Sequence, residues 1–274
     1  WTIYYEETGI KKEETNYVDG VQEGLWTEWF EDGQKRRERN FKNGERDSTW
    51  TTWYKNGNKK FLATYTNGKL NGKYTRWYED GIIKELDGDY LNNKKHKKWI
   101  FWAKNGQKTE EISYNEGIND GSHIKWYGDK NDQHKSFHIN YKNGQKNGDW
   151  HYWYASGLDS LKSNYVDGKK DGHWIWWRKN GLKDKEGFYK KEKKHGVWTV
   201  WNDSSGNAYH RLHEETFVND IIDGKVTKWY KEGDLDRQGV MRGKEREGEW
   251  TYWERGGKRW LKFDYGDGLE RVTL

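Results

Sequence analysis

Aromatic residues recur along the chain with a period close to 24 residues, separated by charged stretches and glycines. Two aromatic slots three residues apart open each copy, and a third aromatic position follows. The slots are Trp26–Trp29, Trp50–Trp53, Tyr74–Trp77, Trp99–Trp102, His123–Trp126, Trp150–Trp153, Trp174–Trp177, Trp198–Trp201, Val226–Trp229 and Trp250–Trp253, after a degenerate Trp1–Tyr4. The third positions are Tyr17, Phe41, Tyr65, Tyr90, Tyr114, Tyr141, Tyr165, Tyr189, Phe217, Met241 and Tyr265. Such self-similarity is the signature of a repeat architecture.

The spacing within a copy has a constant part and a variable part. From the third aromatic position to the next first slot the distance is always 9 residues, whereas from the second slot to the third position it ranges from 12 to 16. All variation in length therefore lies in one of the two connections.

Each copy is predicted to be a β-hairpin. The first strand carries the two slots, and turns such as Asp32-Gly33 and Asn56-Gly57 follow it. Asn-Gly and Asp-Gly favour a two-residue type I′ turn, because both central residues need a positive φ. A second glycine turn, such as Asn43-Gly44, leads back to the next copy. Glycines recur too closely for helices of ordinary length.

Strand alternation assigns these aromatic residues to two faces. Trp26 and Phe30 share one face of the first strand, and Trp29 points to the other. With Asp32-Gly33 as the turn, Phe41 falls on the Trp26 face. The sequence therefore predicts an aromatic stripe on one face and a ladder of second-slot Trp residues on the other.

Composition narrows the possible functions. The chain has 20 Trp, 32 Gly, no Pro and no Cys, and its 50 basic and 45 acidic residues are interspersed. A disulfide scaffold, a Cys zinc site and a cysteine nucleophile are excluded. There is no apolar run long enough for a membrane span, and nucleic acid is an unlikely partner because the basic residues form no block. Missing Pro suits a sheet whose N–H groups are nearly all bonded.

The pattern Tyr-x-Asn-Gly-x-x-x-Gly-x-Trp-x-x-Trp-Tyr followed by a glycine turn, as at residues 141–157, resembles the bacterial MORN repeat variant (MORN_2) of YwqK-type antitoxin-component-like proteins. The resemblance covers essentially the whole chain. It implies an all-β fold, an elongated single-layer antiparallel β-meander of about eleven hairpin repeats in one continuous array over residues 1–274. Repeats would start near Trp1, Trp26, Trp50, Tyr74, Trp99, His123, Trp150, Trp174, Trp198, Val226 and Trp250. Ser48, Asn93, Lys97, Glu192 and Asp220 stand where the pattern expects glycine.

The ladder of second-slot Trp residues is the first candidate binding site, because a row of exposed rings can stack sugars, cations or a peptide. The competing interpretation, which we favour for most rings, is that both aromatic faces only stabilise a sheet without a second layer. The ladder comprises Trp29, Trp53, Trp77, Trp102, Trp126, Trp153, Trp177, Trp201, Trp229 and Trp253.

Two enlarged connections are candidate recognition loops, with Asp129, Lys130, Asn131 and Asp132 in one and Asp203, Ser204, Ser205 and Asn207 in the other. The first resembles a calcium loop only faintly, because no downstream Glu completes it. The nine histidines do not cluster as metal ligands, and no nucleophile or phosphate-binding motif is present. We therefore expect no catalytic residues, no metal site and no cofactor.

These observations predict a non-enzymatic repeat scaffold for protein–protein interaction or assembly. Its partner would be another protein, or a second copy joined through exposed sheet edges, because the chain begins and ends on first slots without polar caps. We expect the native protein to be longer, or its edges to meet another chain. The alternative is a glycan- or cell-wall-binding surface protein that uses the Trp ladder. The resemblance implies a bacterial protein at the cell surface, in the periplasm or secreted.

Overall fold

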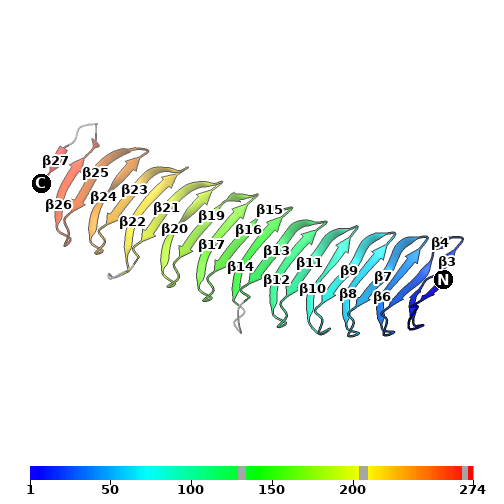
Figure 1. Ribbon diagram of the computed structural model, residues 1–274. Coiled ribbons are helices and arrows are strands. Elements are labelled where there is room, and N and C mark those ends of the chain that lie inside the picture. Colours follow the sequence, from blue (N-terminus) through cyan, green and yellow to red (C-terminus); the bar gives the residue numbers. More distant parts are fainter. Residues whose placement is uncertain (129–133, 204–208, 267–270, 274) are drawn as a thin grey trace. The chain divides into compact units, whose positions relative to one another are not determined.

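Within the described residues the chain folds into antiparallel β-strands, most of which pair with their neighbours in sequence (Figure 1). The computed structural model describes residues 1–128, 134–203, 209–266 and 271–273. Two compact units are present, residues 1–133 with 141–144 and residues 134–140 with 145–274. The predicted all-β, single-layer antiparallel meander is confirmed, and the sheet is open rather than closed into a barrel.

The strands of the first unit are β1 (Thr2–Tyr4), β2 (Lys11–Glu14), β3 (Tyr17–Val18), β4 (Val21–Gln22), β5 (Gly24–Trp29), β6 (Lys35–Lys42), β7 (Glu45–Trp53), β8 (Lys59–Thr66), β9 (Lys69–Trp77), β10 (Lys84–Leu91), β11 (Lys94–Trp102), β12 (Lys108–Asn115) and β13 (Ile118–Trp126). Strand β14 (Lys135–Lys142) contributes to both units. The second unit continues with β15 (Gln145–Lys146), β16 (Gly148–Trp153), β17 (Asp159–Val166), β18 (Lys169–Lys170), β19 (Gly172–Trp177), β20 (Lys183–Lys190), β21 (Lys193–Trp201), β22 (Arg211–Val218), β23 (Ile221–Trp229), β24 (Leu235–Arg242), β25 (Glu245–Trp253), β26 (Arg259–Asp264) and β27 (Arg271–Thr273).

The predicted type I′ turn at Asp32-Gly33 is wrong. Among the hairpin residues only Gly33 has a positive φ, of 86°, and Asp32 does not. Phe30 N–H donates to the Gln34 carbonyl and Gly33 N–H to the Phe30 carbonyl, so three residues form the loop. This is a type I turn followed by a left-handed glycine, and the Asp32 carboxylate accepts the Gln34 N–H at 3.0 Å. The turns at Asn56-Gly57, Asn105-Gly106 and Asn180-Gly181 follow the same pattern.

The register predicted from that turn nevertheless holds. Trp26 lies opposite Arg39 and Gly24 opposite Phe41. The three-residue loop offsets the pairing of the two strands by one residue relative to a two-residue turn. A β-bulge near Arg36, where the pairing shifts between Glu28 and Trp29, offsets it by one residue in the opposite sense. The two deviations cancel, so Trp26 and Phe41 share a face as expected.

Nine described turns at the opposite edge have a positive φ at both central residues, as a type I′ turn requires, whereas the turn at Gly243-Lys244 has it only at Gly243. Asn43 and Gly44 have φ values of 51° and 77°. Three copies without glycine at the second central position keep this conformation, because Asn93, Glu192 and Asp220 have φ values of 67°, 74° and 71°. The side-chain oxygen of each accepts a hydrogen bond from the N–H of a strand residue just after the preceding turn at this edge, at Leu70, Lys170 and Lys194 respectively. This bond compensates for the missing glycine.

Lys97 is a left-handed residue without any such compensation, with φ 59° at the bulge of β11. We expect Lys97→Gly to raise local stability by about 1 kcal/mol, because an L-residue pays about that much in this conformation. Native-state hydrogen exchange of the β10–β12 amides measures the change. Lys98→Gly, at a neighbouring position with ordinary φ, is the control and should lower stability. An equal response to both substitutions contradicts the interpretation.

The core of each unit is the predicted aromatic stripe. Trp50 packs between Phe41 and Tyr65, with ring centroids 5.5 and 4.8 Å away. Trp99 is the most enclosed ring, with only 2% of its surface exposed. The buried first slots are Trp50, Trp99, Trp150, Trp174, Trp198, Val226 and Trp250. These residues hold the sheet together in the absence of a second layer.

Each buried indole also satisfies a backbone carbonyl on the preceding strand. Trp99 Nε1 donates to the Asp89 carbonyl at 3.0 Å, beside the point where the β10–β11 register shifts. A bulge leaves a carbonyl without its ladder partner, and the indole N–H replaces that partner. The same bond, always ten residues back, is made by Trp50, Trp150, Trp174, Trp198 and Trp250.

Glycines make room for three of these rings. A Cβ placed on Gly88 would lie 2.4 Å from the Trp99 ring. Gly187 and Gly239 stand in the same relation to Trp198 and Trp250, with 2.2 Å between the added Cβ and the ring. Their φ values are not positive. In these three copies glycine therefore leaves room for the indole packed on it, rather than serving the backbone conformation.

The two edges join successive copies differently. At the second-turn edge, a turn N–H bonds to the strand that follows the preceding turn, as from Gly68 N–H to the Arg46 carbonyl at 2.9 Å. At the first-turn edge, a tyrosine hydroxyl reaches the second-slot carbonyl of the following copy, as from Tyr54 to Trp77 at 2.9 Å. Burial raises the pKa of Tyr54, which keeps its hydroxyl protonated as a donor. Tyr5, Tyr78, Tyr154 and Tyr230 make the equivalent bond.

Candidate functional site

The aromatic stripe is covered by the protein's own cations. The ammonium group of Lys95 lies 4.5 Å from the Trp99 ring centroid and 5.2 Å from that of Tyr114. A Lys or Arg four residues before the slot covers the buried Trp in the same way at Arg46, Lys146, Lys170, Lys194 and Arg246. Such cation–π contacts shield the ring faces, so the stripe serves the fold and offers no open platform.

The ladder of second-slot Trp residues lies on the opposite face, and all ten rings are half-buried. Lys ammonium groups lie over Trp29, Trp153, Trp177 and Trp201 at 5.3 to 5.9 Å. The His151 ring also contacts Trp153, and Tyr209 stacks on Trp201. Several of these rings are thus already covered by neighbouring side chains. Ligand binding by this ladder stays a prediction.

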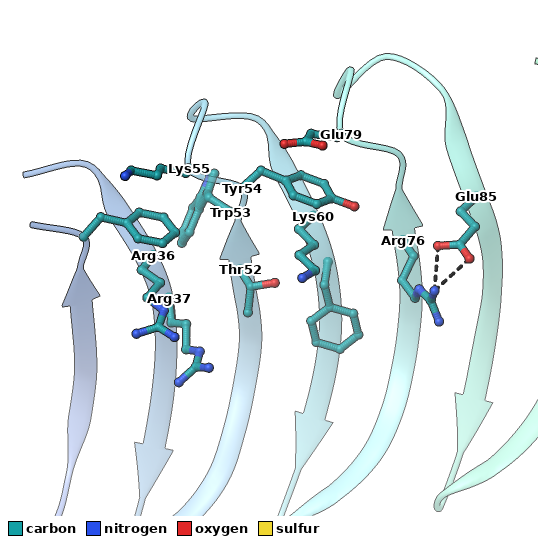
Figure 2. Close-up of a pocket in the computed structure, with 12 residues that line it drawn as sticks. Arg36, Arg37, Thr52, Trp53, Tyr54, Lys55, Lys60, Arg76, Glu79 and Glu85 are labelled. Atoms are coloured by element: carbon teal, nitrogen blue, oxygen red, sulfur yellow. Dashed lines mark hydrogen bonds and ion pairs between the residues drawn. The ribbon is translucent and has the colours of Figure 1, made fainter. Parts of the chain in front are cut away.

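An open groove of about 640 Å³ lies beside the first-turn edge of the first unit (Figure 2). Strands β6 to β9 form its floor, and the aromatic rings of Phe30, Tyr54 and Phe61 line it. Five cationic side chains also line it, whereas only two carboxylates do so: Arg36, Arg37, Lys55, Lys60 and Arg76, against Glu79 and Glu85.

The charges of this groove are only partly neutralised. Arg36 and Arg37 share the single carboxylate of Glu28, at 2.8 and 3.0 Å. Arg76 donates from one nitrogen to both oxygens of Glu85 at 2.7 Å. Within the described part of the chain no carboxylate pairs with Lys55 or Lys60, and the Lys60 ammonium lies 5.2 Å from the Tyr54 ring centroid. The groove therefore keeps an excess of positive charge and several free guanidinium donors.

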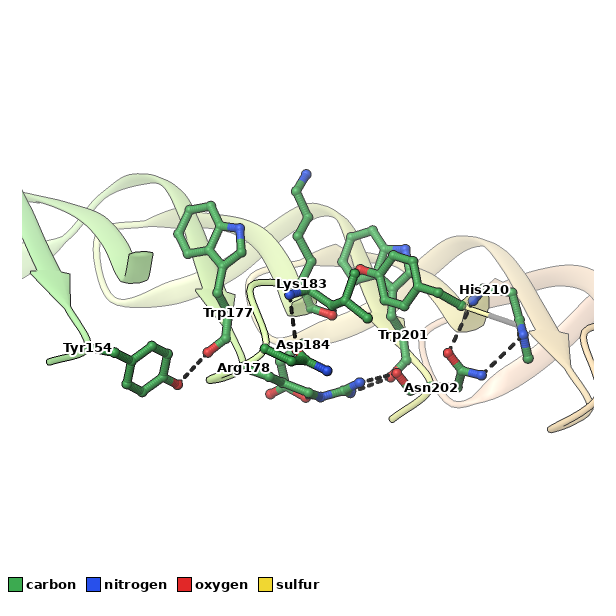
Figure 3. Close-up of polar contacts among 11 residues, drawn as sticks. Tyr154, Trp177, Arg178, Lys183, Asp184, Trp201, Asn202 and His210 are labelled. Atoms are coloured by element: carbon green, nitrogen blue, oxygen red, sulfur yellow. Dashed lines mark hydrogen bonds and ion pairs between the residues drawn. The ribbon is translucent and has the colours of Figure 1, made fainter. Parts of the chain in front are cut away.

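A groove of about 460 Å³ occupies the equivalent position in the second unit. Val200, Trp201 and Leu212 line it where Thr52, Trp53 and Lys60 stand in the first groove. Arg178 replaces the edge tyrosine: it donates to the carbonyls of Trp201 and Asn202 and pairs with Asp184 (Figure 3). The same place in the repeat therefore carries different chemistry in each unit.

The predicted recognition loops lie mostly outside the described residues. This applies to Asp129, Lys130, Asn131 and Asp132, and to Ser204, Ser205 and Asn207. Asp203 is described, and it is exposed and lines the groove of the second unit. Groups of three or more metal-ligating side chains do not occur in the ranges that the structure describes. Nor does any helix there have the length and apolar character to cross a membrane.

Of the residues that line the first groove, only Trp53 is predicted from the sequence as a candidate binding residue. Arg37 and Phe61 lie in the second strand of a hairpin, and Arg76 lies between the slots Tyr74 and Trp77. A signal was available, because applying the hairpin register copy by copy places Arg37, Thr52, Phe61 and Arg76 opposite one another in one row.

The two units should respond differently to acid. Burial lowers the pKa of His138, His151 and His213, all of which lie in the second unit, and in His151 it outweighs the Asp159 carboxylate at 2.6 Å. A lowered pKa means that the unfolded chain binds protons first, so this stabilisation is present above about pH 6.5 and is lost as pH falls below it.

In the first unit the groups with a shifted pKa that titrate in acid are the carboxylates of Asp87 and Glu111. Burial alone would raise the pKa of Asp87 and of Glu111, but hydrogen bonds from Thr75 and Lys84 to Asp87 and from Lys108 to Glu111 hold both values below the ordinary range. Their contribution is lost only below about pH 4.

We expect amide protection corrected for intrinsic exchange to fall in the second unit between pH 7 and 5.5 while the first unit is unchanged. Parallel loss in both units contradicts this assignment.

Comparison with known proteins identifies the repeat. The model of the MORN repeat variant matches residues 22–43, 46–67 and 70–92. No curated protein matches the chain significantly. Two solved structures, "Crystal Structure of TcdB2-TccC3" and "Crystal Structure of TcdB2-TccC3-Cdc42", each show 10% identity and a TM-score of 0.22, and cover 97% and 94% of this chain. The chain spans only 18% and 17% of those proteins, and at this similarity they carry no further argument. The hairpin copies of this protein therefore include three consecutive MORN repeat variants, at residues 22–92.

Proposed function

We propose that this protein is a non-enzymatic binding scaffold that holds a partner protein in the grooves beside its first-turn edge. The observation that carries the proposal is the recurrence of a groove at the same place in the repeat with different side chains. The first groove is lined by Thr52, Tyr54 and Lys60, and the second by Val200, Arg178 and Leu212. A constant frame with variable lining is what a recognition surface on a repeat protein requires.

The rest of the molecule supports this assignment by elimination of competing surfaces. The aromatic stripe is buried and capped by cations, and the second-turn edge is occupied by backbone hydrogen bonds between successive copies. The grooves combine aromatic rings with guanidinium groups, which are side chains enriched in protein interfaces. Binding of a glycan by the Trp ladder is the weaker proposal, because neighbouring side chains cover several ladder rings.

Selection from a random linear peptide library against the whole chain tests the proposal. Enriched peptides carrying a photoreactive group should cross-link to the groove segments, at residues 30 and 52–55 or at residues 178 and 200–203. Cross-links confined to ladder residues outside the grooves, such as Trp102 and Trp126, or a library without enriched binders, would reject it. A parallel titration with soluble wall glycans, followed by Trp fluorescence, examines the glycan alternative.

A further inference from the structure

The groove of the first unit contains a straight row of four side chains on four neighbouring strands. Arg37 of β6 lies opposite Thr52 of β7, Thr52 opposite Phe61 of β8, and Phe61 opposite Arg76 of β9. Because directly opposite residues in a sheet share a face, the four side chains stand side by side. Two guanidinium groups thus flank a short polar residue and an aromatic ring.

The spacing of this row defines a ligand. Arg37 and Arg76 are three strand spacings apart, roughly 14 Å at about 4.8 Å per strand. An extended peptide lying across the strands advances about 3.4 Å per residue, so four residues cover the same distance. Side chains at i, i+2 and i+4 of such a peptide point to one face. A pair of acidic residues at i and i+4 therefore matches the two arginines.

The middle of the row accepts an apolar residue. Residue i+2 of the peptide falls roughly 7 Å from Arg37, between Thr52 and Phe61. The Phe61 ring packs edge-on against Tyr74 at 5.0 Å, which holds it in place, and Phe61 itself lines the groove. An aliphatic side chain between these two residues loses its contact with water without meeting a charge.

We propose that this row binds an extended acidic peptide with the pattern acidic–x–apolar–x–acidic. The proposal rests on the proposed scaffold function and names its partner's chemistry. Arg37 uses Nη1 for Glu28 and Arg76 uses Nη2 for Glu85, so each keeps donors for a second carboxylate. Arg36, Lys55 and Lys60 on the same groove add positive charge, which attracts an acidic segment during encounter.

Separated single charges fit the groove better than a polyphosphate does. Glu79 and Glu85 line it together with the cations, and the Glu28 carboxylate lies within 3.0 Å of Arg37. A phosphate chain would bring dense negative charge against all three carboxylates. A peptide places one carboxylate at each guanidinium and neutral backbone between them. Guanidinium groups recognise such carboxylates through paired N–H donors.

The second unit repeats this arrangement with other residues. Lys185 lies opposite Val200, Val200 opposite His213, and His213 opposite Lys228. These occupy the same repeat positions as Arg37, Thr52, Phe61 and Arg76, so the order cation, short side chain, ring, cation recurs. Next to these four residues the row continues with Trp176, Leu161 and Tyr152 on one side and with Arg237 beside Lys228 on the other. A lysine presents one compact ammonium charge, whereas an arginine guanidinium can donate two parallel N–H bonds to a carboxylate. The second row should therefore bind the same peptide more weakly.

Fluorescence anisotropy with labelled synthetic peptides on the whole chain tests the proposal. The probe carries Asp-Thr-Leu-Thr-Asp between neutral flanks, and a spacing control carries Asp-Thr-Leu-Asp-Thr, whose two carboxylates point to opposite faces. We expect the probe to bind about tenfold more tightly than the spacing control, and Arg76→Gln to weaken it about tenfold. Lys125→Gln, a charge removal in the same row outside the groove, should leave binding unchanged. Circular dichroism confirms that both variants remain folded.

Several outcomes would overturn the proposal. Equal binding of probe and spacing control contradicts the row geometry, and insensitivity to Arg76→Gln contradicts the site. Inorganic polyphosphate that binds more tightly than the probe and displaces it would show a general polyanion site instead. If library selection yields peptides that cross-link to the groove but lack the acidic pattern, the scaffold function stands and this motif fails. If no selected peptide reaches either groove, the scaffold function itself fails.

Discussion

Trp99→Ala is expected to destabilise strands β10 to β12 by about 3–5 kcal/mol, because it removes a fully buried aromatic ring and leaves a cavity. The Asp89 carbonyl would also lose the indole N–H that satisfies it. Trp102→Ala, three residues along the same strand, removes a half-buried ring that makes no such bond, and should cost about 1 kcal/mol. Hydrogen exchange of the β10–β12 amides is the appropriate measurement, since repeat arrays need not unfold in two states. Similar losses in the two variants would mean that both aromatic faces carry the fold equally.

Gly88→Ala is expected to destabilise the same strands by about 1–3 kcal/mol, because the added methyl group overpacks the Trp99 ring. The expected sign is informative, since Gly→Ala at a position with ordinary φ normally stabilises a protein by about 0.4–1 kcal/mol. The loss should therefore come from the ring alone.

Another copy of the repeat supplies the rescue experiment. Ala63 stands where Gly88 does, and the ring in the next first slot is Tyr74 instead of Trp99. Combining Gly88→Ala with Trp99→Tyr recreates this natural pair. In a double-mutant cycle monitored by hydrogen exchange, the combined loss should be smaller than the sum of the single losses. Strict additivity would show that the two positions do not interact.

The repeat, the two faces and the strand register follow from the sequence because they depend on spacing alone. The constant nine-residue spacing from the third aromatic position to the next first slot, together with the alternation of side chains along each strand, predicts that Trp26 and Phe41 share a face. The strand pairing in the structure agrees with this prediction. The turn type does not follow so directly. Asn-Gly is compatible both with a type I′ turn and with a type I turn ending in a left-handed glycine, and the bulge near Arg36 determines which fits.

The contacts between copies could not be predicted from one copy. The bond from the Trp99 indole to the Asp89 carbonyl exists only because the bulge exposes that carbonyl. The Tyr54 hydroxyl donates to the Trp77 carbonyl, 23 residues along the chain, so this bond is not contained in the pattern of any one copy. For the candidate site, the sequence singled out the most conspicuous side chains, the Trp ladder. The groove residues became visible only when opposite positions on neighbouring strands were brought together.

The two kinds of contact between copies have a consequence for how the protein tolerates inserted sequence. A segment grafted between Asn67 and Gly68 would separate a turn that is bonded backbone to backbone to the strand that follows the preceding turn, so the damage would spread to neighbouring hairpins. One grafted between Asn105 and Gly106 would enlarge a loop closed by its own hydrogen bonds, from Ala103 to Gln107 and from Gly106 to Ala103. New domains can therefore be inserted in the turns of the first-turn edge. The turns of the second-turn edge should be left intact, because their backbone hydrogen bonds hold each copy in register with the one before it.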